Sequence, residues 1–248
     1  MAAERNVDQI VLSTFFRSAP SGICLDVGAA GPEYLSIGNG FRKKGWRVIS
    51  VEPNPAFAQM HRDAGNEVIE VAAGSEDRDD VDFTVFDFNG APYEGGGVTF
   101  ESFSSLGTKP EYAASLAVQP VKPGVRTIKV KMRRLDTILR GLVAEGQCID
   151  VLSIDVEGWE LEALSGLDFD RYRPRALIVE NNYDSPDYTE FMNERGYTLW
   201  HILPPNYVYV SRSSLAMAPL SVKLMHQFRI RCILPFHKPN LPPTLIAS

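Results

Sequence analysis

Short apolar runs and longer periodic segments alternate along most of the chain. The short runs are rich in valine, isoleucine and leucine and predict strands at 23–27, 46–51, 67–71, 151–154 and 176–179. The segments that follow them, several of which stop at a glycine, predict helices at 33–44, 56–64, 159–167 and 186–195. Strands that alternate with helices favour a mostly parallel α/β sheet with helices on both faces.

The alternation is interrupted in the middle of the chain and changes again near its end. The interruption comprises strand-like runs at 81–88 and 126–132, a long loop at 89–124 and a helix at 135–143. Two further strand-like runs, 197–203 and 207–211, flank Pro204-Pro205-Asn206. We expect them to form an antiparallel hairpin that closes the sheet.

The two ends of the chain differ from this middle part. Residues 1–20 contain a short apolar patch behind Glu4 and Asp8 and predict a helix. Residues 215–248 contain five prolines and predict no element. We therefore expect one domain over residues 1–211, followed by a basic, proline-containing extension over 212–248.

The composition narrows the class of protein. The chain has 248 residues, 44% of them apolar, and a net charge of −6. The acidic balance argues against a general nucleic-acid binder, and three cysteines are too few for a disulfide framework. No run approaches the roughly 18 apolar residues of a membrane span. The start of the chain lacks the pattern of a secretory signal, so we expect a cytoplasmic protein.

The charges are unevenly distributed. Residues 195–248 contain six lysines and arginines and no aspartate or glutamate, whereas residues 1–194 carry a net charge of −12. This asymmetry indicates a separate role for the C-terminal extension. We consider two such roles, contact with a second subunit in a homodimer and contact with an anionic acceptor carrier.

The first strand–turn–helix unit predicts a nucleotide site. Gly28 and Gly31 let the turn approach a ligand closely, and Glu52, at the end of the second strand, is placed to bind a ribose. The turn lacks the G-x-G-x-x-G pattern, and Asp26 precedes it. A carboxylate there repels a pyrophosphate but suits a sulfonium ligand. The unit therefore favours S-adenosylmethionine over NAD, although a tight turn with glycines used for packing remains an alternative.

Further polar residues follow the later strands. Asp155 and Glu157 follow the strand at 151–154, where they either face the same crevice or cap the next helix. Glu180 and Asn181 follow the strand at 176–179. Asp155, Glu180 and Asn181 are candidate ligands of Mg²⁺, although a hydrogen-bonded loop is the alternative. Two nearby carboxylates can also raise one pKa and make a general base. His201 is a further catalytic candidate, or a structural histidine.

These motifs together resemble the FkbM family of S-adenosylmethionine-dependent methyltransferases. The residues that carry the resemblance are Asp26-Val27-Gly28-Ala29-Ala30-Gly31, Val51-Glu52-Pro53-Asn54-Pro55, Ala73-Gly74, Ser104-Ser105-Leu106, Leu135-Asp136 and Ile154-Asp155-Val156-Glu157-Gly158-Trp159-Glu160. The chain departs from the family pattern in having alanine at position 30, where asparagine is common, and Trp159, where a small residue is common. The resemblance covers about residues 23–197.

The resemblance implies a class I methyltransferase (Rossmann-like) fold with a seven-stranded sheet. It implies a cofactor site in which Asp26, Gly28 and Gly31 surround the methionine part, Glu52 binds the ribose, and Ala72 and Ala73 lie near the adenine. The expected cofactor site also includes residues next to these positions, namely Ala29, Ala30, Pro53 and Asn54. Asp155 and Glu157 carry over as the acidic motif at the reaction edge, whereas the resemblance assigns no general base.

The activity that the resemblance implies is O-methylation of a sugar or of a glycosylated or secondary metabolite, so the expected partner is a small-molecule or glycan acceptor. Two other classes stay open. An NAD-dependent oxidoreductase or epimerase lacks support, because the chain has neither G-x-G-x-x-G nor the Tyr-x-x-x-Lys pair. A non-catalytic subunit that retains the cofactor fold is the other alternative.

Overall fold

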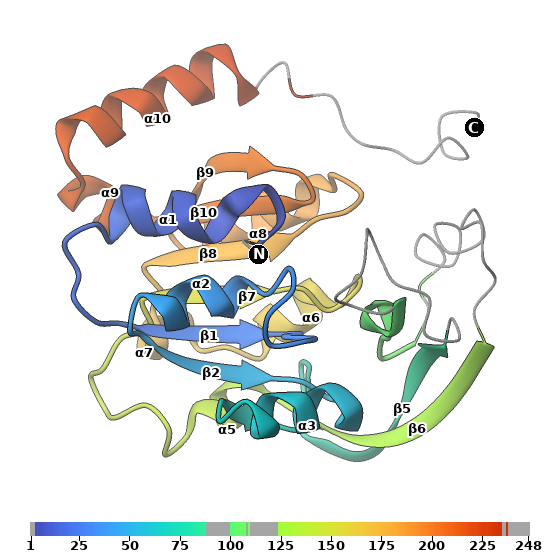
Figure 1. The fold of residues 1–248 in the computed structure, drawn as a ribbon. Coiled ribbons are helices and arrows are strands. Elements are labelled where there is room, and N and C mark those ends of the chain that lie inside the picture. The colour runs from blue at the N-terminus through green and yellow to red at the C-terminus, as the bar shows by residue number, and fades with distance from the viewer. Residues whose placement is uncertain (1–2, 88–99, 108, 110–123, 235–236, 238–248) are drawn as a thin grey trace, which may run out of the picture.

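A seven-stranded sheet forms the centre of the molecule in the computed structural model (Figure 1), which describes residues 3–87, 100–107, 109, 124–234 and 237. In spatial order the strands are β3 (Glu67–Ile69), β2 (Arg47–Val51), β1 (Ile23–Val27), β7 (Val151–Ile154), β8 (Ala176–Glu180), β10 (Asn206–Ser211) and β9 (Tyr197–Leu203). The first five are parallel to one another, and β10 is antiparallel to both β8 and β9. The predicted α/β fold with its closing hairpin is confirmed.

The register of the central strands brings the predicted site residues to one edge of the sheet. Asp26 of β1 lies opposite Ser50 of β2 and Ser153 of β7. All residues of β1, β7 and β8 are buried, as expected for parallel strands covered on both faces. Because these strands run in the same direction, the turns that follow them meet at their carboxyl ends.

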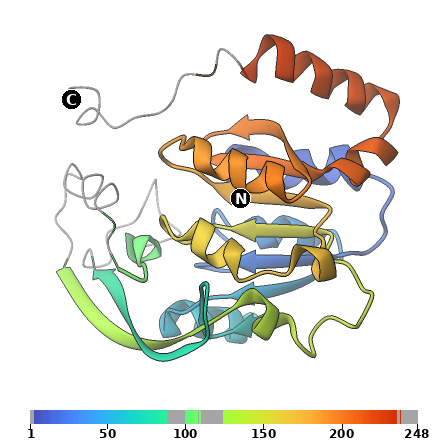
Figure 2. The same cartoon turned by 180° about the vertical axis from the view of Figure 1, so that it is seen from behind.

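Helices cover both faces of this sheet (Figures 1 and 2). One face packs against α1 (Val7–Phe15) and α2 (Ile37–Lys43), and the other against α5 (Leu135–Leu139), α6 (Glu160–Ser165), α7 (Phe169–Tyr172) and α8 (Pro186–Glu194). The helix α3 (Pro55–Asp63) lies beside β3, and a 3₁₀ turn η1 (Glu4–Asn6) precedes α1. Most helices are shorter than predicted. For example, α2 begins only after Ser36, whose hydroxyl oxygen caps it.

A second, three-stranded sheet departs from the prediction. The predicted strand at 67–71 ends at Ile69, and the chain leaves the main sheet to form β4 (Ala72–Ala73). This strand pairs with β6 (Gly124–Arg133), which pairs with β5 (Arg78–Asp87). Phe83, Val85, Val130 and Met132 form a small core with Ala72, which explains the alternation in both long strands. A short 3₁₀ turn, η2 (Phe100–Phe103), lies between β5 and β6 in the chain. Most of the predicted 89–124 loop lies outside the described residues.

The C-terminal extension contains two helices, α9 (Arg212–Met217) and α10 (Leu220–Cys232). The prediction of no element from residue 215 onward was therefore wrong up to Cys232. Pro219 stands at the N-cap of α10, where its ring interrupts no helical hydrogen bond. Apolar residues occur on both faces of this helix, so no single stripe marks it in the sequence. No helix among the described residues is long and apolar enough to cross a bilayer.

Candidate active site

A cavity of about 640 Å³ lies at the carboxyl ends of β1, β2, β7 and β8. This is the edge at which open α/β sheets bind ligands, and the volume falls within the roughly 300–1,000 Å³ of small-molecule sites. Of the residues predicted for the cofactor, those that line it are Asp26, Gly28, Ala29, Ala30, Glu52, Pro53, Ala72, Ala73, Asp155 and Glu157. Other lining residues include Glu4, Arg5, Ser153, Glu180, Asn181 and Asp184.

The turn after β1 approaches the end of β7 so closely that only glycine fits at position 28. Gly28 has a φ of +77°, and a Cβ there would lie 1.6 Å from the carbonyl oxygen of Asp155. The Asp155 N–H in turn donates to the Val27 carbonyl oxygen at 3.0 Å. The two strand ends that bear Asp26 and Asp155 are therefore held in direct backbone contact.

Two side chains clamp the same turn from the other side. Ala30 has a φ of +42°, a conformation that is costly for a residue with a Cβ. Its N–H donates to Glu52 Oε2 at 2.8 Å, and His61 Nε2 donates to its carbonyl oxygen at 3.0 Å. Burial raises the pKa of Glu52 to about 7 and lowers that of His61 to about 4. The clamp therefore contains a neutral imidazole near pH 7.

Asp26 lies beneath the turn and is satisfied by the start of α2. Its Oδ2 accepts the N–H of Gly38 at 3.1 Å. Burial raises the pKa of Asp26, and the nearby Arg42 guanidinium opposes that rise. Arg42 also donates to Ser50 Oγ, on the neighbouring strand, at 2.7 Å. The predicted carboxylate is thus present at the cavity floor, with a cation behind it.

Two of the residues predicted for the cofactor do not line the cavity. Gly31 is buried outside it. Asn54 begins α3, and its Oδ1 accepts the Ala56 N–H at 3.0 Å. Its backbone N–H donates to Glu52 Oε1 at 2.8 Å. Asn54 therefore acts on the site through Glu52, as a cap and a hydrogen-bond donor.

Three carboxylates meet where β7 and β8 end. One oxygen from each of Asp155, Glu160 and Glu180 lies within 4.8 Å of the others. Burial, followed by the charges of Glu4 and Glu160, raises the pKa of Asp155 to about 8. Burial and the Asp155 charge raise the pKa of Glu180 well above its ordinary value. Asp155 and Glu180 also share a hydrogen bond, which requires a proton on one of the two carboxyl groups.

Glu160 fixes the loop that carries Asp155. Its Oε1 accepts the N–H groups of Val156 at 3.1 Å and Gly158 at 2.9 Å, and its Oε2 accepts the Tyr188 hydroxyl at 2.6 Å. The loop needs this support because Glu157, between the two N–H groups, has a φ of +57°. The Glu160 side chain is almost fully buried. Burial raises the pKa of Glu160, and its three hydrogen bonds oppose that rise by stabilising the charged form, which is a negative neighbour of Asp155.

Of the predicted Mg²⁺ ligands, Asp155 and Glu180 lie together with Glu160, whereas Asn181 is engaged elsewhere. The Asn181 side chain closes the following turn, where its Oδ1 accepts the Ser185 N–H and its Nδ2 donates to the Ser185 carbonyl oxygen, both at 3.0 Å. Both oxygens of Glu160 accept hydrogen bonds from protein groups, and Asp155 shares one with Glu180. We therefore assign these oxygens to hydrogen bonding rather than to a cation.

His201 lies apart from these groups. It belongs to β9, the edge strand of the sheet, and does not line the cavity. Its ring stands edge-on to Trp200. Burial and the nearby Arg229 lower its pKa to about 4. The structure thus places this catalytic candidate outside the cavity, near Arg229 of α10.

Sequence reasoning missed the residues that hold the site in shape. His61 follows Phe57 by one helical turn on the buried face of α3, a spacing that could have indicated a buried histidine. Glu160 belongs to the acidic run after β7 but was given no role of its own. Tyr188 gave no signal, because it reaches Glu160 from a different helix. The contribution of Glu4, which lines the cavity from η1, was not predictable either.

The comparison with known families agrees with this geometry. The sequence profile of the methyltransferase FkbM domain matches residues 26–199, which is more than half of the chain. The matched range begins at Asp26 and includes both the Gly28 turn and the three carboxylates. None of the curated proteins compared with the chain matches it.

Proposed function

This chain belongs to the FkbM methyltransferase family, and from that premise we propose that it transfers the methyl group of S-adenosylmethionine to a hydroxyl oxygen. The acceptor we propose is a sugar or a glycosylated or secondary metabolite. The observation that carries the proposal is the pairing of Asp155 with Glu180 beside the Gly28 turn, in one cavity. The turn suits a cofactor, and the carboxyl pair suits removal of a hydroxyl proton.

The first half of the cavity fits S-adenosylmethionine. Gly28 lines the cavity at the turn, and Asp26 offers a negative charge near a sulfonium. Glu52 keeps acceptor lone pairs beyond its two backbone hydrogen bonds, which suits ribose hydroxyls. The Ser153 hydroxyl is buried and has no hydrogen-bond partner among the described residues, which leaves a polar group for a ligand.

Asp155 is the residue that we assign as general base. The cofactor supplies an activated methyl group when bound. Asp155 accepts the acceptor's proton as the acceptor oxygen forms its bond to the methyl carbon, and the O–H bond breaks. A base with a pKa near 8 is well matched to a hydroxyl acceptor at neutral to mildly alkaline pH. Glu180, protonated, holds Asp155 in place through their shared hydrogen bond.

Binding and turnover can be tested separately on the full chain. We expect S-adenosylmethionine and S-adenosylhomocysteine to raise the thermal midpoint and NAD to leave it unchanged. Mass spectrometry then follows methylation across a panel of hydroxylated sugars and glycosides. Asp155→Asn should bind S-adenosylhomocysteine as the wild type does and lose turnover. Glu190→Gln, an exposed acid on α8 outside the cavity, is the matched control and should retain the rate.

Each other outcome changes a defined part of the proposal. Stabilisation by NAD alone would replace the methyltransferase assignment by an oxidoreductase. Cofactor binding without turnover on any acceptor would favour a non-catalytic subunit. Retained turnover in Asp155→Asn would remove Asp155 as the base. Because the carboxylate oxygens are occupied by hydrogen bonds, we expect a chelator to leave the rate unchanged, and a loss restored by Mg²⁺ would overturn this part.

A further inference from the structure

The outer face of α10 carries a stripe of exposed apolar side chains. Leu220, Leu224 and Phe228 follow one another at four-residue spacing and therefore share one face of the helix. Their exposed fractions are 70%, 56% and 58%. Met217, at the end of α9, is exposed beside them at 87%. Large side chains gathered in this way on an outer surface mark a contact site rather than ordinary surface variation.

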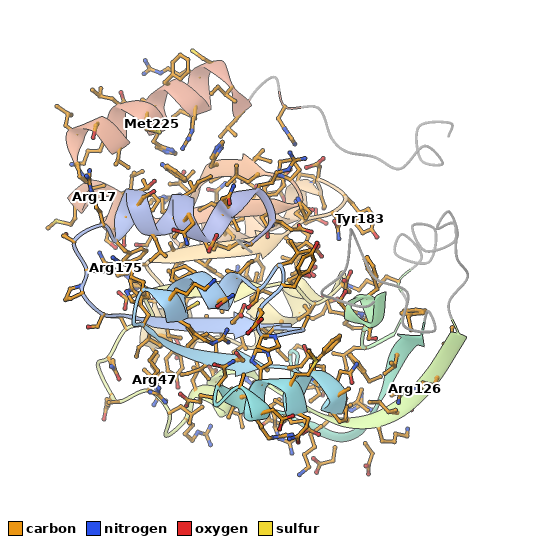
Figure 3. The ribbon with its side chains drawn as sticks, in the orientation of Figure 1. Arg17, Arg47, Arg126, Arg175, Tyr183 and Met225 are labelled. Atoms are coloured by element: carbon orange, nitrogen blue, oxygen red, sulfur yellow. The ribbon has the colours of Figure 1, made fainter. Side chains whose placement is uncertain are left out.

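The opposite face of α10 already has a partner, so the stripe is not a misplaced core face. Val222 and His226 are buried, one helical turn apart. Arg229 follows on the same side and lies over the Trp200 ring of β9, at 4.2 Å from its centroid. Figures 1 and 2 show α10 as the outermost element on this side of the molecule, and Figure 3 labels Met225 on it.

The charged side chains of α9 and α10 are all basic. On α10, Arg231 is exposed and Lys223 is half-buried, and Arg212 is exposed at the start of α9. No acidic residue occurs anywhere in residues 195–248, whereas the preceding part carries a net charge of −12. The surface therefore combines apolar side chains with bases and complements an extended negative charge.

We propose that α9 and α10 form a docking surface for an anionic membrane, on which α10 lies in the plane of the lipid headgroups. Exposed leucine and phenylalanine side chains on the outer face of α10, with the basic side chains of Lys223 and Arg231 on the same helix, can enter a bilayer interface. The convex outer helix can sink its apolar stripe among the acyl chains without a complementary groove. Lys223, Arg231 and Arg212 then meet the lipid phosphates.

Pairing of two copies through this face is disfavoured by the same charges. A two-fold dimer places each patch against itself. Arg212, Lys223 and Arg231 would then approach bases of the second copy, with no acid on either helix to balance them. The homodimer, one of the two roles considered from the sequence, is therefore the competing outcome, and the test below distinguishes it from membrane binding.

The test is sedimentation of the full chain with vesicles of phosphatidylcholine alone or of phosphatidylcholine with phosphatidylserine. We expect binding only to the vesicles that contain phosphatidylserine. Binding should weaken as salt rises from about 0.1 M to about 1 M, since the Debye length falls from ~10 to ~3 Å. Replacing Lys223 and Arg231 with glutamine should weaken it about fivefold for each base. The double variant Leu224→Gln/Phe228→Gln should weaken it more than tenfold.

The controls keep folding and binding apart. Leu224, Phe228 and Arg231 are exposed and Lys223 is only half-buried, so the thermal midpoint should stay near the wild-type value. Val125→Gln, at a 63% exposed apolar residue of β6, is the matched control and should bind as the wild type does. Absence of binding, or equal binding to both vesicle types, overturns the proposal. A dimer that forms without vesicles and is lost in Leu224→Gln/Phe228→Gln assigns the face to a second copy instead.

Discussion

Replacing Tyr188 by phenylalanine tests how the loop that carries Asp155 is held. The change removes one hydroxyl and leaves the ring in its place. That hydroxyl donates to Glu160 Oε2 at 2.6 Å, and the Glu160 side chain is almost fully buried. Glu160 keeps its hydrogen bonds to the Val156 and Gly158 N–H groups but loses the donor on the other oxygen. The variant thus weakens the support that Glu160 gives to the loop carrying Asp155, and it changes no residue that lines the cavity.

The size of the effect follows from the chemistry of that bond. A hydrogen bond to a charged group contributes about 1.5–3 kcal/mol. For a protein of this size, 1 kcal/mol shifts the thermal midpoint by about 2–4 °C, so Tyr188→Phe should lower it by about 3–12 °C. Small displacements of a catalytic group cost up to about 100-fold in rate. We therefore expect kcat to fall by about 10- to 100-fold while the affinity for S-adenosylhomocysteine stays near that of the wild type.

The assay combines differential scanning fluorimetry, calorimetric binding and turnover with an acceptor that the wild type methylates. Tyr209→Phe is the matched control, since this buried tyrosine bonds only the neutral hydroxyl of Thr189, at 3.1 Å, among the partners described. A neutral bond contributes about 0.5–1.5 kcal/mol. The control should therefore lose less thermal stability than Tyr188→Phe and should retain kcat.

Glu160→Gln separates the charge of Glu160 from its support of the loop. The rate should rise with pH as Asp155 ionises, near its pKa of about 8. The Glu160 charge contributes to that raised pKa, so its removal should move the rise in rate to lower pH. A purely structural role would lower the rate without moving the profile. Unchanged stability and kcat in Tyr188→Phe, or a profile displaced to higher pH in Glu160→Gln, would refute the reasoning.

Three further predictions concern the turn and the buried ionisable groups. Gly28→Ala should abolish S-adenosylhomocysteine binding in calorimetry, because the Cβ would meet the Asp155 carbonyl oxygen; wild-type affinity would contradict the close approach. The pKa of Asp155 is raised from 3.8 to about 8, so the wild type loses stability as pH rises through this interval. Asp155→Asn removes this loss and should therefore have a higher thermal midpoint than the wild type above pH 8. Equal midpoints of the two proteins would contradict it. The pKa of His61 is lowered from 6.5 to about 4, so the stability of the wild type should fall as pH drops through this interval. The stability of His61→Gln should fall less, and urea midpoints measure the difference.

The order of elements in the main sheet was predictable because it is a local property of the chain. Buried parallel strands such as 151–154 are continuous apolar runs, and each ends at polar or glycine residues. The rule that ligands bind at the carboxyl ends of such strands then points to Asp26, Glu52 and Asp155, because each of them stands at or just after the end of a predicted strand. These three residues do line one cavity.

The sequence could not determine which partners each of these side chains meets. Glu160 and Tyr188 come together only because α6 and α8 pack on the same face of the sheet. The Asn181 amide, a candidate ligand from its sequence position, is used within its own turn by Ser185. His201 is directed away from the site because β9 is the edge strand of the hairpin. Contacts between distant segments depend on packing, which local patterns do not encode.

The two helices at the C-terminus show the same division. The sequence by itself determined that residues 195–248 lack acids and contain six lysines and arginines. Only the tertiary structure decided which face of α10 is exposed, because Arg229 and His226, both polar, turn inward toward Trp200 while Leu224 and Phe228 turn outward. Hydropathy does not predict this orientation, because apolar residues occur on both faces of α10. The Arg229 guanidinium, stacked on Trp200, and the buried His226 imidazole occupy the inner face of α10. The apolar stripe therefore stays exposed on the outer face, where a partner can contact it.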